Sequence, residues 1–321
     1  MIRKIKSICV FLMLLVMAIS QVACKEKEVT VELPQNISLT TQEDHQPTIK
    51  MYDVNTKEIK EMELEEYLKG VLAGEMFNNW SLEALKAQAI LARTFTLQYL
   101  QNSTSKYEGA DISNDITEAQ AYDESKINDS IENAVNETRG KVIMSDGKLI
   151  EAWFHSNSGG KTTTANTGLG FLGEENHTKT ADSPETAENS ENYNWSATFT
   201  KSEILSALRE MGVSVSSLSS FIVGEKDESG RATTFRMGDS EFSANTFRLK
   251  IGSTKMKSTL IDDIVVSANS IAFTGRGYGH GVGMSQWGAK IMAEEGKTAD
   301  EIIEYYFENI DIVYVNYENA N

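Results

Sequence analysis

Apolar and polar positions in the first hundred residues predict a hairpin followed by two helices. The alternation over residues 49–54 and 59–62 is typical of two short strands joined by a turn. Residues 64–76 instead repeat apolar side chains at the three- and four-residue spacing of an amphipathic helix. A longer helix is predicted over residues 82–100, with Ser81 as its N-cap.

The remaining pattern predicts further helices and strands in separate groups. Residues 127–138 predict a third amphipathic helix, and residues 142–144 and 149–154 predict strands joined by a turn at Asp146-Gly147. The polar composition of residues 160–194 is typical of a long surface loop. After that loop the pattern predicts a strand, a helix, several strands, a glycine-rich loop and two helices, over residues 195–199, 201–211, 220–273, 275–283, 284–292 and 299–307.

This mixture of segregated helices and hairpins predicts an α+β fold, with helices packed on antiparallel strands and hairpins. We expect a single elongated catalytic domain with loop insertions over residues 49–317. Residues 25–48 are polar, mostly acidic and without periodicity, which predicts a tether in front of that domain.

The first 24 residues have the pattern of a targeting segment. A basic start precedes an apolar run over residues 8–19, and small and polar residues then lead to Cys24. The apolar run is short for a membrane span, which needs about 20 residues. A cleaved or lipid-modified signal and an uncleaved membrane anchor both stay open, although Gln21 disfavours lipid attachment at the cysteine. We expect an exported protein held at the outer face of the cytoplasmic membrane.

The charge of the chain limits its partners. The formal net charge is −17, and the targeting segment carries three basic and no acidic side chains, so the remainder carries −20. Such a body repels phosphate backbones, which excludes nucleic acid and favours a neutral sugar chain or a cationic partner protein. The two cysteines, Cys9 and Cys24, both lie in the targeting segment. The exported body therefore has no disulfide, cysteine nucleophile or thiolate metal ligand.

Glu75 is the first candidate for chemistry. It follows an apolar stretch and precedes Met76, Phe77 and Trp80. A carboxyl group held among such side chains loses solvation, which raises its pKa and keeps it protonated near neutral pH. A protonated carboxyl is what a general acid needs to protonate a glycosidic oxygen. The alternative is an ordinary solvated glutamate near a helix end.

Two glycine-containing segments supply further candidates. Residues 155–160 place His155, Ser156 and Ser158 just after a predicted strand, where a ligand can approach the backbone. The context of a serine hydrolase nucleophile is absent there, and a plain turn is the alternative. The glycine-rich segment around His280 lacks the lysine of a phosphate-binding loop. Two histidines without a third placed ligand are weak evidence of a metal site.

Taken together and in this order, five blocks resemble the stage II sporulation protein D family, whose domain is shared with amidase-enhancer proteins. The resemblance covers roughly residues 48–317. Its blocks are Tyr67-Leu-Lys-Gly-Val to Glu75-Met76, Glu83 through Ala89 to Ala92-Arg93-Thr94, Gln120-Ala-Tyr122, His155 through Gly160, and Gly279 through Gln286 followed by Gly288-Ala289.

The resemblance implies a lytic transglycosylase that cuts peptidoglycan strands stripped of stem peptides during engulfment in endospore formation. It also implies a partner amidase, and it places the catalytic glutamate at Glu75. One carboxyl group suffices for such an enzyme, whereas a glycoside hydrolase normally needs two. A glycan-binding activator of an amidase without catalysis, and a structural partner, are the alternatives. The other site residues that we predict to bind substrate or brace the groove are Lys86, Gln88, Arg93, His155, Ser156, Ser158, His280, Gly281, Ser285 and Gln286.

The chain departs from the family at one metal site. Some members carry a zinc site with the spacing His-x5-Cys-x5-Cys before the glutamine-aromatic block. This chain has Tyr107, Ser113 and Ala119 at the matching positions. None of the three is a useful zinc ligand, so we predict no metal and no cofactor.

Overall fold

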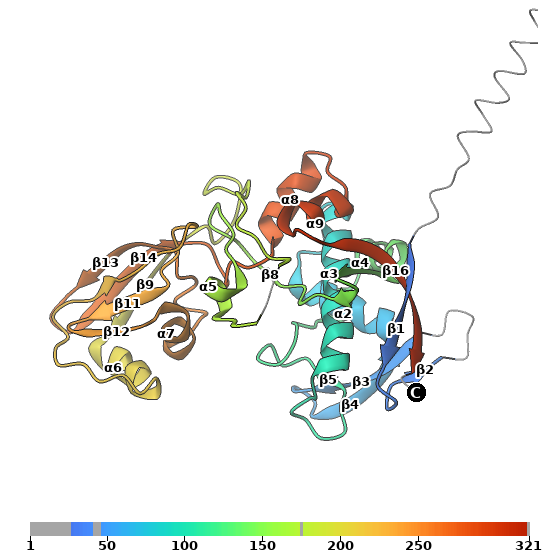
Figure 1. Ribbon diagram of the computed structural model, residues 1–321, viewed down its shortest axis with the longest axis horizontal. Helices are drawn as coiled ribbons and strands as arrows, with labels where there is room; N and C mark the ends of the chain where they lie inside the picture. Colours follow the sequence, from blue (N-terminus) through green and yellow to red (C-terminus); the bar gives the residue numbers. More distant parts are fainter. Residues whose placement is uncertain (1–26, 41–45, 174–175, 320–321) are drawn as a thin grey trace, which may run out of the picture.

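The computed structural model describes residues 27–40, 46–173 and 176–319. Helices and mostly antiparallel sheets alternate in it, which confirms the α+β class. The molecule is elongated, with two lobes that each enclose a hydrophobic core (Figure 1). We define the first lobe as the described residues up to 152 together with 284–319, and the second lobe as residues 194–276.

The first lobe is built around one long helix, α3. Its helices are α2 (Leu64–Glu75), α3 (Leu82–Asn102), α4 (Asp129–Glu137), α8 (Gln286–Glu294) and α9 (Ala299–Tyr306), with a short 3-10 helix η1 (Glu124–Lys126). All four other helices pack on α3. This is possible because Ala84, Ala87, Ala89 and Ala92 are buried along it, and small side chains let neighbouring helices come close.

Two sheets cover these helices. One contains β1 (Glu28–Leu33), β16 (Asp311–Asn319), β6 (Lys141–Ser145) and β7 (Lys148–Leu149), and the other contains β2 (Ser38–Leu39), β3 (Pro47–Asp53), β4 (Glu58–Glu63) and β5 (Ile112–Ser113). The tether predicted over residues 25–48 is therefore wrong for β1. That strand pairs in parallel with β16 and buries Val31 and Leu33, so it belongs to the folded lobe.

The second lobe packs two sheets and two helices around a cluster of phenylalanines. Its strands are β9 (Asn194–Thr200), β10 (Ile222–Val223), β11 (Thr234–Met237), β12 (Ser240–Ser243), β13 (Ile261–Val266) and β14 (Ser270–Arg276), and its helices are α6 (Lys201–Glu210) and α7 (Ala244–Ile251). The sequence pattern predicts only strands where α7 lies. The Ser243 hydroxyl starts α7 by accepting a hydrogen bond from the Thr246 amide, and Phe247 anchors the helix in the core.

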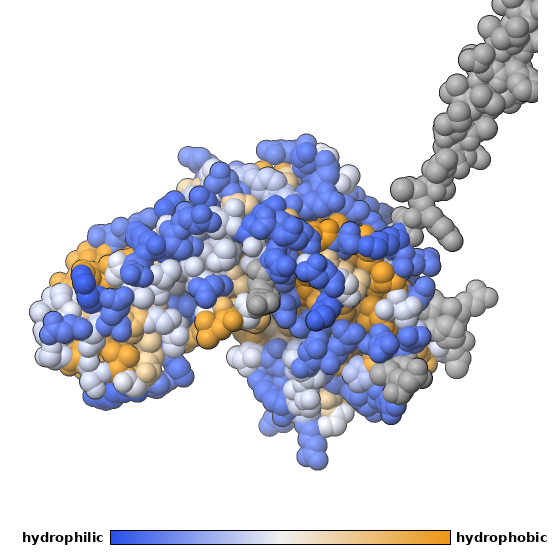
Figure 2. Space-filling view, in the orientation of Figure 1, coloured by the Kyte–Doolittle hydropathy of each residue, from blue (hydrophilic) through white to orange (hydrophobic). Residues whose placement is uncertain are grey.

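The segments between the lobes bring two sequence motifs together. The strand predicted over residues 149–154 is split, and its second part forms β8 (Phe154–His155). This strand pairs in parallel with β15 (Met284–Ser285), which follows the glycine-rich segment. The loop predicted over residues 160–194 contains one short helix, α5 (Ala165–Leu169). The surface is hollowed between the two lobes along one side (Figure 2).

Within the described ranges, none of the helices has the length and apolarity needed to cross a bilayer. The signal or anchor predicted over residues 1–24 lies outside these ranges. The predicted division into targeting segment, tether and domain otherwise stays a prediction.

Candidate active site

A cleft with a volume of about 530 Å³ lies where α2, α3, β8 and the glycine-rich segment meet. Five of the predicted site residues line it: Glu75, His155, Ser156, His280 and Gln286. The structure thus brings together candidates that are up to 211 positions apart, as the numbers of Glu75 and Gln286 show. The other lining residues are Gly74, Phe95, Ile116, Ala119, Gln120, Ala152, Trp153, Phe154, Tyr278 and Gly279.

Glu75 is the last residue of α2 and is half-buried in the cleft wall. Its Oε1 accepts a hydrogen bond of 2.7 Å from the Ala121 amide. Burial raises the pKa of Glu75 above its ordinary value of 4.5, and hydrogen bonds from Ala121 and from the Gln286 side chain act in the opposite direction. The position therefore favours the protonated acid while holding donors ready for the ionised form.

The cleft walls carry few kinds of ionisable side chain. Among the described residues that line it, Glu75 is the only one with a carboxyl group, and none is a lysine or an arginine. Aromatic side chains contribute much of the rest, and flat apolar rings suit the faces of sugar rings. They are Phe95, Trp153, Phe154 and Tyr278. The cleft can thus offer a single acid to an uncharged part of a substrate.

Glycines on α2 allow the segment that holds Glu75 to dock. A Cβ atom at Gly70 would lie 2.1 Å from the Tyr122 ring, and one at Gly74 would lie 2.7 Å from the Tyr122 amide nitrogen. Real side chains do not fit at such distances, so these glycines form a seat for residues 121–122. The seat in turn delivers the Ala121 amide to Glu75.

We expect Gly74→Ala to reduce activity far more than stability. The added methyl group forces the backbone of residues 121–122 away, at a cost of about 1–3 kcal/mol. Alanine recovers up to about 1 kcal/mol through its helix propensity. Moving a group at the reacting centre by about 1 Å costs on the order of 100-fold in rate. Turnover measured beside thermal melts checks this, and a variant with normal turnover would show that the seat does not position Glu75.

Two histidines lie side by side in the cleft, with ring centroids 5.6 Å apart. His155 Nδ1 contacts the Val282 carbonyl oxygen at 3.0 Å, and His280 Nδ1 accepts a hydrogen bond of 3.0 Å from the Val282 amide. Burial lowers the pKa of His280 to about 3, helped by the positive charges of Arg248 and Arg231. Both rings are therefore neutral near pH 7, and the charge of a histidinium is not available to the cleft.

The structure contradicts the predicted substrate contact for Arg93. Its side chain is 0% exposed and forms a two-pronged ion pair with Glu65 at 2.8 and 2.7 Å. A third nitrogen donates to the Lys141 carbonyl oxygen at 3.1 Å. Arg93 is a brace between α2, α3 and β6, because a guanidinium without access to solvent cannot touch a glycan.

Lys86 and Gln88 also lie outside the cleft lining. Lys86 pairs with Glu83 at 2.8 Å and with Glu137 at 2.6 Å, and so ties α3 to α4. Gln88 is buried, and its Oε1 faces the Gln286 side chain at 3.5 Å. The predicted direct contact with substrate is therefore wrong for both side chains. Gln88 instead contacts Gln286, whose side chain hydrogen-bonds Glu75.

Ser158, Ser285 and Gly281 lie beneath the cleft instead of in its wall. Both serines are fully buried and donate to Glu185 Oε1, at 2.5 and 2.7 Å. A Cβ atom at Gly281 would lie 2.4 Å from the buried guanidinium of Arg231. These three positions fix the two glycine-containing segments to each other. The substrate contacts predicted for them are therefore wrong. The role of Glu185 is not visible in the sequence, since nothing in a polar stretch marks one acid as buried.

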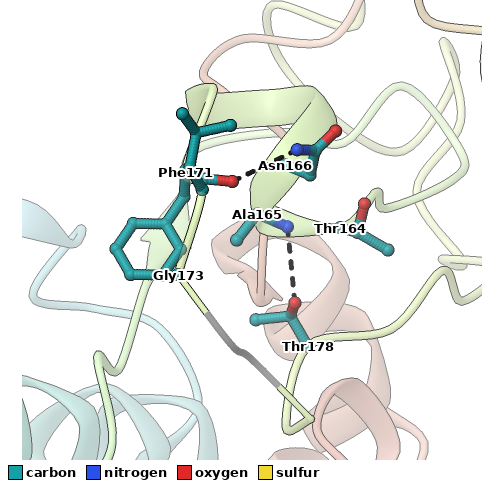
Figure 3. A pocket seen from close by; sticks show the side chains of 7 residues that line it. Thr164, Ala165, Asn166, Phe171, Gly173 and Thr178 are labelled. Atoms are coloured by element: carbon teal, nitrogen blue, oxygen red, sulfur yellow. Dashed lines mark hydrogen bonds between the residues drawn. The ribbon is translucent and has the colours of Figure 1, made fainter.

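A second, smaller pocket of about 190 Å³ lies beside α5. Figure 3 shows the Ala165 amide donating to the Thr178 hydroxyl and the Asn166 side chain donating to the Phe171 carbonyl oxygen. Among the described residues that line it, none is ionisable. We assign no chemistry to this pocket.

The region of the family's zinc site is ordered by packing. The Tyr107 ring stacks on Tyr52 at 4.2 Å, and its hydroxyl donates to Asp115 at 2.8 Å. In the described part of the chain, no three histidine, cysteine or acidic residues cluster as metal ligands. The lack of a metal stays a prediction. Elemental analysis after purification without added metal should find well below one zinc per chain, and stoichiometric zinc would contradict it.

Comparisons with known proteins bear on the family of the chain. The family model described as stage II sporulation protein matches residues 52–144. Stage II sporulation protein D of Bacillus subtilis is 32% identical over 83% of this chain and 78% of that protein. An uncharacterized protein of Brachyspira hyodysenteriae is 33% identical over 81% of this chain and 69% of its own length. An amidase enhancer of Bacillus subtilis is 30% identical over 75% of this chain and 39% of that protein. The chain therefore belongs to the stage II sporulation protein D family.

Proposed function

We propose that this protein is a lytic transglycosylase that cuts denuded peptidoglycan strands between muramic acid and glucosamine units. The observation that carries the proposal is the cleft with a single carboxyl group, that of Glu75, whose pKa is raised by burial. An inverting or retaining hydrolase normally places two carboxyl groups across the scissile bond. One acid that changes its protonation state is enough when the sugar supplies its own nucleophile.

In this mechanism Glu75 first donates its proton to the oxygen that bridges the two sugars. The bond from the anomeric carbon to that oxygen breaks, and the leaving sugar departs with a free hydroxyl. The ionised Glu75 then removes the proton from the 6-hydroxyl of the muramic acid unit, whose oxygen bonds to the anomeric carbon. The product is a 1,6-anhydro ring, no water is consumed, and Glu75 ends in its starting form. The Ala121 amide and Gln286 stabilise the carboxylate between the two steps.

The names of the relatives suggest where this activity is used. Two of them are called stage II sporulation protein D and one is called amidase enhancer. We propose that the protein works beside a cell-wall amidase that strips stem peptides, in septal wall degradation during engulfment. The basic and apolar start of the chain supports export and attachment at the outer face of the cytoplasmic membrane.

The second candidate is a glycan-binding activator of an amidase that cuts no bond itself. It is favoured by the amidase enhancer among the relatives. Pure protein incubated with denuded glycan separates the two, because 1,6-anhydro-muramic ends detected by mass spectrometry arise only from a lytic transglycosylase. Stimulation of an amidase without such ends would favour the activator.

The pH dependence of cleavage tests the role of Glu75. We expect kcat/KM to fall on the alkaline side, since the acid must be protonated, with an apparent pKa above the ordinary 4.5. The hydrogen bond from Gln286 stabilises the ionised form, so Gln286→Leu should raise the pKa and move this limb to higher pH. A limb that stays in place or moves to lower pH in a variant of normal melting temperature would argue against this assignment.

A further inference from the structure

Two side chains in the cleft wall have a polar atom without a partner. Gln120 is 3% exposed and His155 is 4% exposed, and both line the cleft. Gln120 Oε1 and His155 Nε2 have no hydrogen-bond partner within the described residues. Buried polar atoms are nearly always paired, because an unpaired one costs on the order of 1–3 kcal/mol. Two such atoms on one cleft point to a ligand that completes them.

The orientation of the Gln120 amide is determined by its neighbours. Its Nε2 donates to Thr96 Oγ1 at 3.1 Å and faces the Ala92 carbonyl oxygen at 3.5 Å. The Thr96 hydroxyl already donates its hydrogen to the Ala92 carbonyl oxygen at 2.8 Å, so it can only accept from Gln120. An amide turned the other way would place two acceptors against each other. The free atom of Gln120 is therefore its carbonyl oxygen, an acceptor.

The tautomer of His155 is determined in the same way. Its Nδ1 lies 3.0 Å from the Val282 carbonyl oxygen, which can only accept, so Nδ1 carries the hydrogen. Burial, together with the nearby His280 and Arg231, holds the pKa of His155 well below 6.5. The ring is neutral, and Nε2 presents a lone pair. The second free atom is therefore also an acceptor.

We propose that Gln120 and His155 form an acceptor pair for an N-acetylated sugar, in which Gln120 receives a hydrogen bond from the acetamido N–H group and His155 receives one from a hydroxyl group. This inference rests on the proposed function and names a recognition step within it. Gln120 precedes Ala121, whose amide donates to Glu75, so Gln120 lies beside the acid, and His155 lines the same cleft. The sugar is favoured over a cationic donor because four aromatic side chains line the cleft and only one carboxyl group does, and burial raises the pKa of that carboxyl group.

Paired substitutions of His155 test this in full-length protein that carries Glu75→Gln to prevent turnover. His155→Asn can keep a donor near Nδ1 but has no atom at Nε2, whereas His155→Gln can place an amide oxygen near Nε2. We expect His155→Asn to weaken binding of denuded glycan strands about 3- to 10-fold, as for loss of one neutral hydrogen bond. His155→Gln should retain more of the affinity. Equal binding by His155→Asn and the Glu75→Gln parent would overturn the proposal.

Gln120→Met provides an independent measurement if the His155 variants do not fold. Methionine keeps the volume and removes both the Oε1 acceptor and the Nε2 donor to Thr96, so we expect a similar 3- to 10-fold loss for N-acetylated glycan, and de-N-acetylated strands isolate the part due to the acceptor. De-N-acetylated strands, which lack the amide N–H group, should bind weakly to the parent and lose less on substitution. Equal losses for both strands in Gln120→Met would contradict an acetamido contact.

Nitrogen NMR of labelled parent protein adds a readout that a purely structural role would not move. The His155 Nε2 resonance should shift from that of a free lone pair toward that of a hydrogen-bonded one when denuded glycan is added. An unchanged resonance at saturating glycan would overturn the role of His155.

If wild-type protein forms no anhydro ends yet these effects appear, the lytic assignment fails and the acceptor pair stands. If the wild-type protein cuts glycan and the variants bind normally, the lytic assignment stands and the acceptor pair fails.

Discussion

Glu75→Gln is expected to lower the rate of glycan cleavage by about 10²–10⁴ while leaving the fold and glycan binding in place. Glutamine keeps the shape of the side chain and can still accept the hydrogen bond from the Ala121 amide. It cannot donate a proton to the bridging oxygen, and it cannot remove the proton from the 6-hydroxyl. Release of 1,6-anhydro ends from denuded glycan, measured with thermal melts and binding, checks this.

Glu118→Gln is a matched control for that experiment. Glu118 lies on the same segment as the cleft residue Ala119, but it is not in the lining and accepts from Ser105 and the Lys106 amide. We expect its amide variant to cut glycan at close to the wild-type rate. A Glu75→Gln protein that cuts at the wild-type rate would remove the acid role from Glu75 and with it the proposed mechanism.

Arg93→Met is expected to destabilise the protein by about 3–5 kcal/mol. Arg93 and Glu65 are almost wholly buried, with exposed fractions of 0% and 1%, and removal of one partner leaves the other as an uncompensated buried charge. Chemical denaturation measures the change. The double variant Arg93→Met, Glu65→Met should recover much of the loss, because replacing a whole buried pair by apolar groups is often neutral.

Lys86→Met is the corresponding comparison on the surface of the same helix. Its partners Glu83 and Glu137 have side chains that are 34% and 51% exposed, so water screens these ion pairs. Such pairs contribute about 0–1 kcal/mol, and we expect a change of that size. If Arg93→Met costs no more than Lys86→Met, the buried pair does not hold α2 and α3 together.

Local patterns in the sequence determine the elements whose stabilising contacts lie within a short stretch of chain. The apolar spacing over α2 and α3 suffices for those helices, and the turn between β6 and β7 follows from Asp146-Gly147, whose φ angles are +49° and +77°. Ser81 does start α3, but its side chain makes no capping hydrogen bond, so only the position was predictable. The placement of Glu75 at the end of a helix, among apolar neighbours, is likewise visible in the sequence.

Contacts between distant segments were decided by the tertiary structure. The alternation of Val29, Val31 and Leu33 is present in the sequence, yet it becomes a strand only because β16, almost 300 residues away, provides an edge for it. Nothing in a linear pattern separates the buried Glu185 from its solvated neighbours, since its burial depends on the hydroxyl groups of Ser158 and Ser285 from two other segments.

The candidate site divides in the same way. Its ingredients are local motifs, and the sequence by itself determined that Glu75, His155, His280 and Gln286 belong to them. Whether a side chain faces the cleft or the core depends on which segments pack against it, and that is a property of the folded chain. The sequence therefore determined the candidate acid and its apolar setting, whereas only the tertiary structure separated Arg93, a buried brace, from Gln120, a wall residue with a free acceptor.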